Sequence, residues 1–171
     1  MSPGCHIVPS AFFRKFHIIL LAFAIVLGLM CGIVTAHSSK QDFSSLMENT
    51  SFDVSATGLV TILVFPLLFM FFSVYKPKWY FLFPLCFIRF FLFTYCAWGL
   101  TAAIGCGGWL FSFLYLFSGH MILPLELWFM IRCIAGDTDV RARDIGAYLC
   151  VLCLIFFLDH HFISPLLIIL T

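Results

Sequence analysis

Long apolar stretches separated by short polar segments dominate the chain. Five of them reach about 20 residues, the length that an α-helix needs to cross a hydrocarbon core about 30 Å thick. They cover residues 16–36, 57–75, 81–104, 109–131 and 145–170. Apolar and polar residues do not alternate in them, which disfavours a membrane β-barrel, and helices then satisfy the backbone in lipid. The pattern predicts an all-α, polytopic membrane bundle of five transmembrane helices, with the whole chain as one membrane domain.

The fifth stretch leaves an alternative open. It is apolar for 14 residues, up to Leu158, and then carries Asp159, His160 and His161 before it turns apolar again. At 1.5 Å per residue, 14 residues rise only about 21 Å. The alternative is therefore four transmembrane helices followed by a re-entrant or interfacial C-terminal segment.

The first stretch also has a second interpretation. Val34, Thr35 and Ala36 resemble a signal-peptidase site, and cleavage there would leave four helices. The apolar run before this site spans 20 residues, which is longer than the apolar core of an ordinary signal peptide. We therefore expect the first stretch to remain as an uncleaved signal anchor.

Lysine and arginine predict the orientation of the helices, because loops rich in these residues stay in the cytoplasm. Of the nine basic residues, seven fall on one side of the predicted bundle, Lys40 falls on the other, and Arg89 lies inside the third stretch. This places the N-terminus in the cytoplasm, the C-terminus outside and a loop over 37–56 outside. The seven are Arg14, Lys15, Lys76, Lys78, Arg132, Arg141 and Arg143.

Composition supports the same class of protein. The chain has 171 residues, of which 63% are hydrophobic and only 10% charged, whereas soluble domains are about a quarter charged. A net charge of +1 gives no basic field for nucleic acid. Soluble, disordered and nucleic-acid-binding classes are therefore excluded, and the lipid bilayer is the first expected partner.

Two charged residues inside the apolar stretches are candidates for function, because ionisable groups are costly in a bilayer. Arg89 lies eight residues past Phe81, about 12 Å deep, and Glu126 lies six before Arg132, about 9 Å deep. A short glycine turn makes their two helices neighbours, so we predict a buried ion pair. It acts either as a structural clamp between the helices or as part of a proton or ion relay.

A second polar layer is expected nearer the outer surface. His120 lies about 18 Å from the cytoplasmic end of its helix and Asp159 about 21 Å from that of the fifth, so they are at similar depth. With His160 and His161 they form a candidate metal-ligand set. Consecutive helical residues point about 100° apart, however, so these side chains face one ion only if the helix unwinds. We expect capping and interfacial polarity instead, with no metal, no cofactor and no catalytic residues.

Gly28 and Gly32 form a GxxxG pattern in the first stretch. Such a pattern allows two helices to approach closely, although two unrelated glycines are an equally good interpretation. Pro66, Pro84 and Pro124 are expected to kink or break the second, third and fourth helices.

The layout of the third and fourth stretches resembles stage II sporulation protein M of endospore-forming bacteria. It has a basic hairpin at 76–78, a charged residue in the next helix, a glycine turn at 105–108, and an apolar run through 118–120 to Pro124. His120 and Glu126 stand six apart, whereas the broader family has a histidine and a glutamate four apart. The resemblance implies a bacterial cell membrane and a non-enzymatic anchor for a complex of cell-wall hydrolases during engulfment.

Three classes of function follow from these observations. The first is a membrane scaffold that works through protein–protein contacts, anchoring a cell-wall-remodelling complex if the resemblance holds. The second is a small transporter or permease subunit, indicated by the proline-interrupted helices and the Arg89–Glu126 layer. The third is an intramembrane metal-dependent enzyme, which depends on His120, Asp159 and His160 alone.

Overall fold

The computed structural model describes residues 11–39, 56–74, 80–104, 108–135 and 142–163, together with Pro165. This part of the chain is helical and contains no strand. Its elements are α1 (Ala11–Ser38), α3 (Ala56–Val74), α4 (Leu82–Ile104), α5 (Gly108–Tyr115), α6 (Phe117–Ala135), α7 (Ala142–Leu158) and the π-helical turn η2 (Asp159–Ile163).

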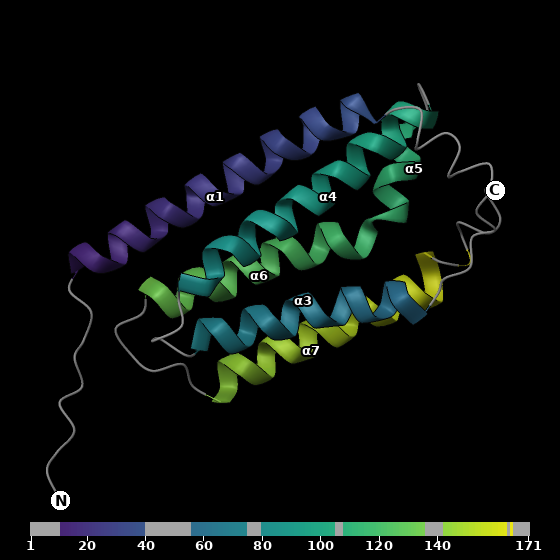
Figure 1. Cartoon of the computed structure of the whole chain (residues 1–171). Coiled ribbons are helices and arrows are strands. Elements are labelled where there is room, and N and C mark those ends of the chain that lie inside the picture. The colour runs from purple at the N-terminus through teal and green to yellow at the C-terminus, as the bar shows by residue number, and fades with distance from the viewer. Residues whose placement is uncertain are drawn as a thin grey trace, which may run out of the picture.

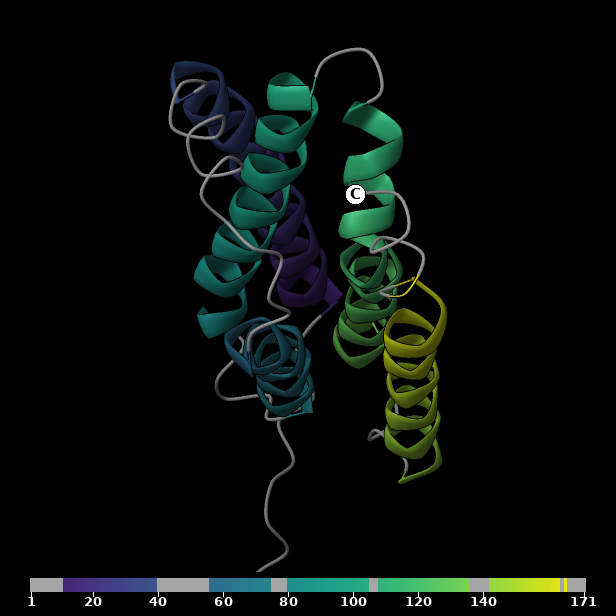
Figure 2. The same ribbon diagram turned by 90° about the vertical axis from the view of Figure 1, so that its right-hand side faces the viewer.

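The long helices run side by side with alternating direction (Figure 1). The beginnings of α1, α4 and α7 and the ends of α3 and α6 share one end of the bundle, which we call the basic end. α6 lies centrally and contacts α1, α3 and α7, whereas α1 and α4 form the most extensive helix pair. Figure 2 shows α1 and α4 on one side and α6 and α7 on the other.

Four of these helices are long and apolar enough to span a membrane: Arg14–Ser38, Leu82–Ala102, Phe117–Ile134 and Ala142–Ile163. α3 adds a shorter apolar segment, Val64–Val74, within the residues whose side chains are described. Many large apolar side chains point out of the bundle, which is the arrangement expected where lipid is the solvent. The chain is thus an all-α membrane protein with at least four helices of spanning length.

Several predicted boundaries need correction. The fourth stretch, predicted as one helix over 109–131, is two helices, because the chain departs from helix at Leu116 between α5 and α6. The fifth, predicted over 145–170, leaves α-helical geometry at Asp159 and continues as η2. Residues 166–171, and residues 40–55 of the predicted outer loop, lie outside the described part of the chain.

The core near the basic end draws on four helices. α1, α3, α4 and α6 all contribute buried apolar side chains to one cluster, which comprises Leu21, Ala24, Phe69, Leu82, Cys86, Met130 and Ile134. Two smaller clusters join α6 to α7, one around Ile122 and one around Phe129 and Tyr148. The cluster that unites the four helices lies next to the charged residues described below.

The three prolines occupy different helical positions. Pro66 and Pro124 lie inside α3 and α6, where each removes a backbone hydrogen bond. Pro84 is the third residue of α4, where the N–H has no intrahelical partner to lose. The expectation that Pro84 kinks or breaks its helix was therefore wrong.

Candidate functional site

A buried ion pair joins α4 and α6 in the basic half of the bundle. Arg89 lies seven residues after the start of α4, and Glu126 lies six residues before Arg132 in α6. The Nε of Arg89 donates to Oε2 of Glu126 across 3.3 Å. Only 10% of the Arg89 side chain and 2% of the Glu126 side chain are exposed. The structure thus brings together the two charged residues that were expected to pair.

Apolar and aromatic groups surround this pair. The guanidinium of Arg89 lies 5.2 Å from the centre of the Phe65 ring of α3, within the range of a cation–π interaction. The thiol of Cys86, one turn before Arg89, lies 3.7 Å from the Met130 sulfur, one turn after Glu126. The pair is therefore enclosed by soft, weakly polar side chains from α3, α4 and α6.

The ion pair is incomplete in its hydrogen bonding. Nη2 of Arg89 and Oε1 of Glu126 are both buried and have no hydrogen-bond partner among the described residues. A buried charge without its partner is strongly destabilising, whereas a pair in contact offsets much of its desolvation. Each of the two charges is therefore stabilised by the other, and their contact fixes the position of α4 along the axis of α6.

A tyrosine fixes the helices on the other side of α6. The hydroxyl of Tyr148, which is fully buried, donates a hydrogen bond of 3.1 Å to the backbone carbonyl of Pro66. Its ring packs against Phe129, with 4.7 Å between ring centres. α7 is thus tied to α3 by a polar contact and to α6 by an aromatic one.

Gly28 and Gly32 lie where α1 and α4 approach most closely. A Cβ atom added at Gly28 would stand 2.7 Å from the carbonyl oxygen of Phe87, and one at Gly32 would stand 2.8 Å from that of Phe91. Such distances leave no space for a side chain. The structure therefore places both glycines of the predicted packing face against the α4 backbone.

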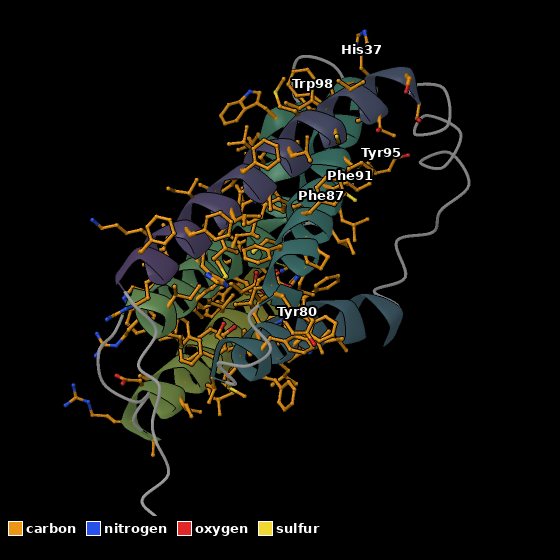
Figure 3. All side chains as sticks on the ribbon, turned by 60° about the vertical axis from the view of Figure 1, so that its left-hand side comes forward. His37, Tyr80, Phe87, Phe91, Tyr95 and Trp98 are labelled. Atoms are coloured by element: carbon orange, nitrogen blue, oxygen red, sulfur yellow. The ribbon has the colours of Figure 1, made fainter. Side chains whose placement is uncertain are left out.

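Three aromatic rings follow one another along this part of α4. Phe87, Phe91 and Tyr95 follow one another at four-residue spacing, with ring centres 6.1 and 6.0 Å apart and nearly parallel planes. Figure 3 shows these three rings along one side of α4, with Trp98 beyond them. The glycines of α1 thus meet the α4 backbone beside Phe90 and Thr94, next to this row of rings.

The outer polar layer centres on the interruption between α5 and α6. The Asp159 carboxylate accepts a hydrogen bond from the backbone N–H of Ser118, the second residue of α6. The first N–H groups of a helix have no intrahelical partner, and a carboxylate there is favoured by the helix dipole. Asp159 thus caps α6 from another helix.

His120 lies one turn into α6, between two aromatic rings. Its ring centre is 4.7 Å from that of Phe93 and 4.8 Å from that of Phe113. Its Nδ1 lies 2.9 Å from the carbonyl oxygen of Leu116, so this nitrogen carries the proton and donates it. The imidazole therefore adds a second hydrogen bond to the Leu116 carbonyl, which also accepts from the backbone N–H of His120.

The side chains of His160 and His161 have different surroundings from the carboxylate of Asp159. Both are exposed, and their rings stack on Phe156 and Phe157 one turn earlier. Within the described part of the chain, no group of three histidine, cysteine or acidic residues is arranged to hold a metal ion. The four residues of the predicted layer thus divide between capping, aromatic packing and the bundle surface.

Sequence reasoning missed four contributors to these contacts. Tyr148 was overlooked because a tyrosine near a helix start resembles an interfacial residue. Ala24 and Ala36, both buried, extend the Gly28 and Gly32 spacing by one turn in each direction; the four-residue repeat of small side chains was available as a signal. The backbone N–H of Ser118 had no sequence signal, because neither glycine nor proline marks the interruption at Leu116.

Comparison with known proteins adds no relative. No protein family model, no curated protein and no solved structure matches the chain.

Proposed function

We propose that the chain is a five-pass membrane scaffold that acts without catalysis by holding other membrane or membrane-tethered proteins. In this proposal α3 is the fifth span, since its 19 residues are mostly apolar and include no charged side chain. The basic end faces the cytoplasm, as the lysine and arginine distribution favours, and α7 leads towards the outside. Retention of α1 is supported by Ala36, which is completely buried inside a continuous helix.

One observation carries the scaffold proposal: the buried side chains of Arg89, Glu126 and Tyr148 form contacts between helices. Arg89 binds Glu126, and Tyr148 binds the Pro66 carbonyl. A transport site needs polar groups that face a path for substrate, whereas these groups face neighbouring helices. The arrangement favours a rigid bundle whose outer surface is free for partners.

The resemblance to stage II sporulation protein M gives this proposal a specific form. In that form the chain lies in a bacterial cell membrane and anchors cell-wall hydrolases during engulfment. Its support is the sequence layout alone: the basic hairpin at 76–78, Arg89 within a helix, and the glycine turn before α5.

The test is affinity purification of the tagged full chain from its native host in mild detergent, with mass spectrometry of the proteins that co-purify. Recovery of cell-wall hydrolases would support the specific form, and recovery of other membrane proteins in fixed ratio would support a scaffold in general. A chain that purifies alone would contradict both. A Gly146→Ala variant serves as a handling control, because a Cβ at Gly146 meets nothing within 4 Å.

A small transporter or permease subunit is the second candidate. It is favoured by the interruption of α5–α6 beside the π-helical turn η2, because broken helices at one level are typical of transporter binding sites. Candidate substrates would raise the melting temperature of the purified protein if they bind the folded state. A scaffold would show no such response to small molecules.

A further inference from the structure

We propose that the corner between α6 and α7 at the basic end binds the headgroup of an anionic phospholipid. The corner consists of Trp128, Arg132, Arg143 and Asp144. This inference does not depend on the scaffold role, because it concerns only how the bundle meets its lipid.

Arg132 is held in place without being covered. Its Nη2 lies 3.3 Å from Oδ1 of Asp144, and its guanidinium carbon lies 5.8 Å from the centre of the Trp128 ring, one helical turn earlier. The Arg132 side chain is nevertheless 53% exposed, whereas that of Asp144 is 14% exposed. A guanidinium has five N–H donors, so Asp144 orients the group and leaves donors for a ligand.

The charge of this end suits an anion. Of the residues that the structure describes, Arg14, Lys15, Arg132 and Arg143 lie at the basic end, and Asp144 is the one acidic residue there. Figure 3 shows the nitrogen tips of long side chains gathered where α1 and α7 begin. The opposite end has neither lysine nor arginine within the described ranges.

The surface beside Arg132 indicates a lipid and not a free anion. Trp128 is 46% exposed and Ile131 is 47% exposed, so apolar side chains flank the guanidinium on the outside of α6. A ligand there meets charge at its head and an apolar surface along its body. Tryptophan favours the depth of lipid headgroups, and guanidinium groups bind phosphate through paired hydrogen bonds. A phospholipid with net negative charge has this combination.

The experiment uses the purified full chain in a neutral detergent. Native mass spectrometry measures the binding of phosphatidylglycerol and of phosphatidylcholine with identical acyl chains. We expect tighter binding of phosphatidylglycerol and about fivefold weaker binding in Arg143→Ala, since a basic residue near the surface contributes about 1 kcal/mol towards anionic lipid. Equal binding of the two lipids would overturn the proposal.

Two variants separate a defined site from general charge. Lys15→Ala removes one positive charge from the same end but lies on α1, so it should leave the phosphatidylglycerol affinity unchanged. Arg132→Ala/Asp144→Ala leaves the net charge unchanged and no ion of the pair unpartnered, and should weaken binding about fivefold. An equal loss in Lys15→Ala and Arg143→Ala, or full binding in the double variant, would contradict a site at this corner.

A third arm separates lipid from free anion. Inorganic phosphate, added in excess, should not displace phosphatidylglycerol, because it lacks the apolar body that Trp128 and Ile131 accommodate. Displacement by phosphate would assign the corner to a soluble anion and reject the phospholipid.

Discussion

Tyr148 of α7 donates its hydroxyl hydrogen to the backbone carbonyl of Pro66 in α3 across 3.1 Å, and both residues are fully buried. A polar side chain and a proline thereby meet between two helices that are far apart in the sequence. The contact gives α3 a hydrogen-bonded neighbour in α7.

Removal of this hydroxyl should loosen α3 with little change in packing. Tyr148→Phe keeps the ring against Phe129 and deletes only the donor. Hydrogen bonds between membrane helices average about 0.6 kcal/mol, so we expect a loss of about that size in the free energy of unfolding, measured by denaturant titration in micelles. Tyr80→Phe, at an exposed ring, is the control and should leave the stability unchanged. A Tyr148→Phe protein as stable as wild type would show that the bond contributes nothing.

Because the two charges stabilise each other, we expect the effects of substitutions at Arg89 and Glu126 on the free energy of unfolding to be strongly non-additive. Glu126→Ala leaves the buried Arg89 charge alone, which should cost about 3–5 kcal/mol. Arg89→Leu/Glu126→Leu replaces both charges with apolar groups and should lie close to wild type in stability. Unfolding measurements on both single leucine variants and the double variant complete the cycle. Additive losses would indicate that the two residues act independently.

Because α1 and α4 approach closely, we expect substitutions at their contact glycines to be more destabilising than a substitution at an exposed glycine. Gly32→Leu forces a side chain into the Phe91 carbonyl, and we expect a loss of about 2 kcal/mol or more, since overpacking alone costs about 1–3 kcal/mol. Gly28→Leu should behave alike. Gly146→Leu, where the space is open, is the matched control and should fold normally. If melting temperatures fell equally in all three, general helix effects and not the α1–α4 contact would be responsible.

The cap on α6 predicts a local effect of Asp159. Asp159→Ala removes the acceptor of the Ser118 N–H, and loss of a helix cap costs about 1 kcal/mol. The Ser118 amide should then exchange its hydrogen faster, while amides near the basic end keep their rates. His161→Ala, at an exposed neighbour in the same turn, should leave exchange at Ser118 unchanged. Unaltered exchange in Asp159→Ala would exclude the capping contact.

The fold class could be predicted from the sequence, because long apolar runs indicate directly that lipid surrounds the helices. Apolar runs of spanning length located α1, α4, α6 and α7, and the depths of Arg89 and Glu126, together with the glycine turn between their helices, were enough to predict that the two residues pair. The helix interruption at Leu116 was not predicted: the backbone N–H of Ser118, just after it, has its acceptor, Asp159, more than 40 residues later in the chain. Local sequence does not reveal a backbone bond completed by a distant helix.

Proline was the least reliable guide. Its effect depends on its distance from the start of the helix, and predicted boundaries are too coarse to give that distance. Pro84 begins α4 without disturbing it, whereas Pro66 lies deep in α3 and supplies a carbonyl to Tyr148. The same residue type thus serves as a helix start in one place and as part of a helix contact in another.

The packing of α1 against α4 has a consequence for biosynthesis. Proteins are made from the N-terminus, so α1 enters the bilayer while α4, whose backbone receives Gly28 and Gly32, is still unmade. Until then the strip of small residues on α1 faces acyl chains. A photoreactive lipid should therefore label this strip in the unaltered chain when it is stalled on the ribosome after Val74, but not when it is extended beyond α6. Equal labelling at both lengths would contradict this order. Chains truncated before α4 would keep this strip of α1 exposed to lipid. We expect membrane quality control to recognise unfinished chains by such an exposed helix face.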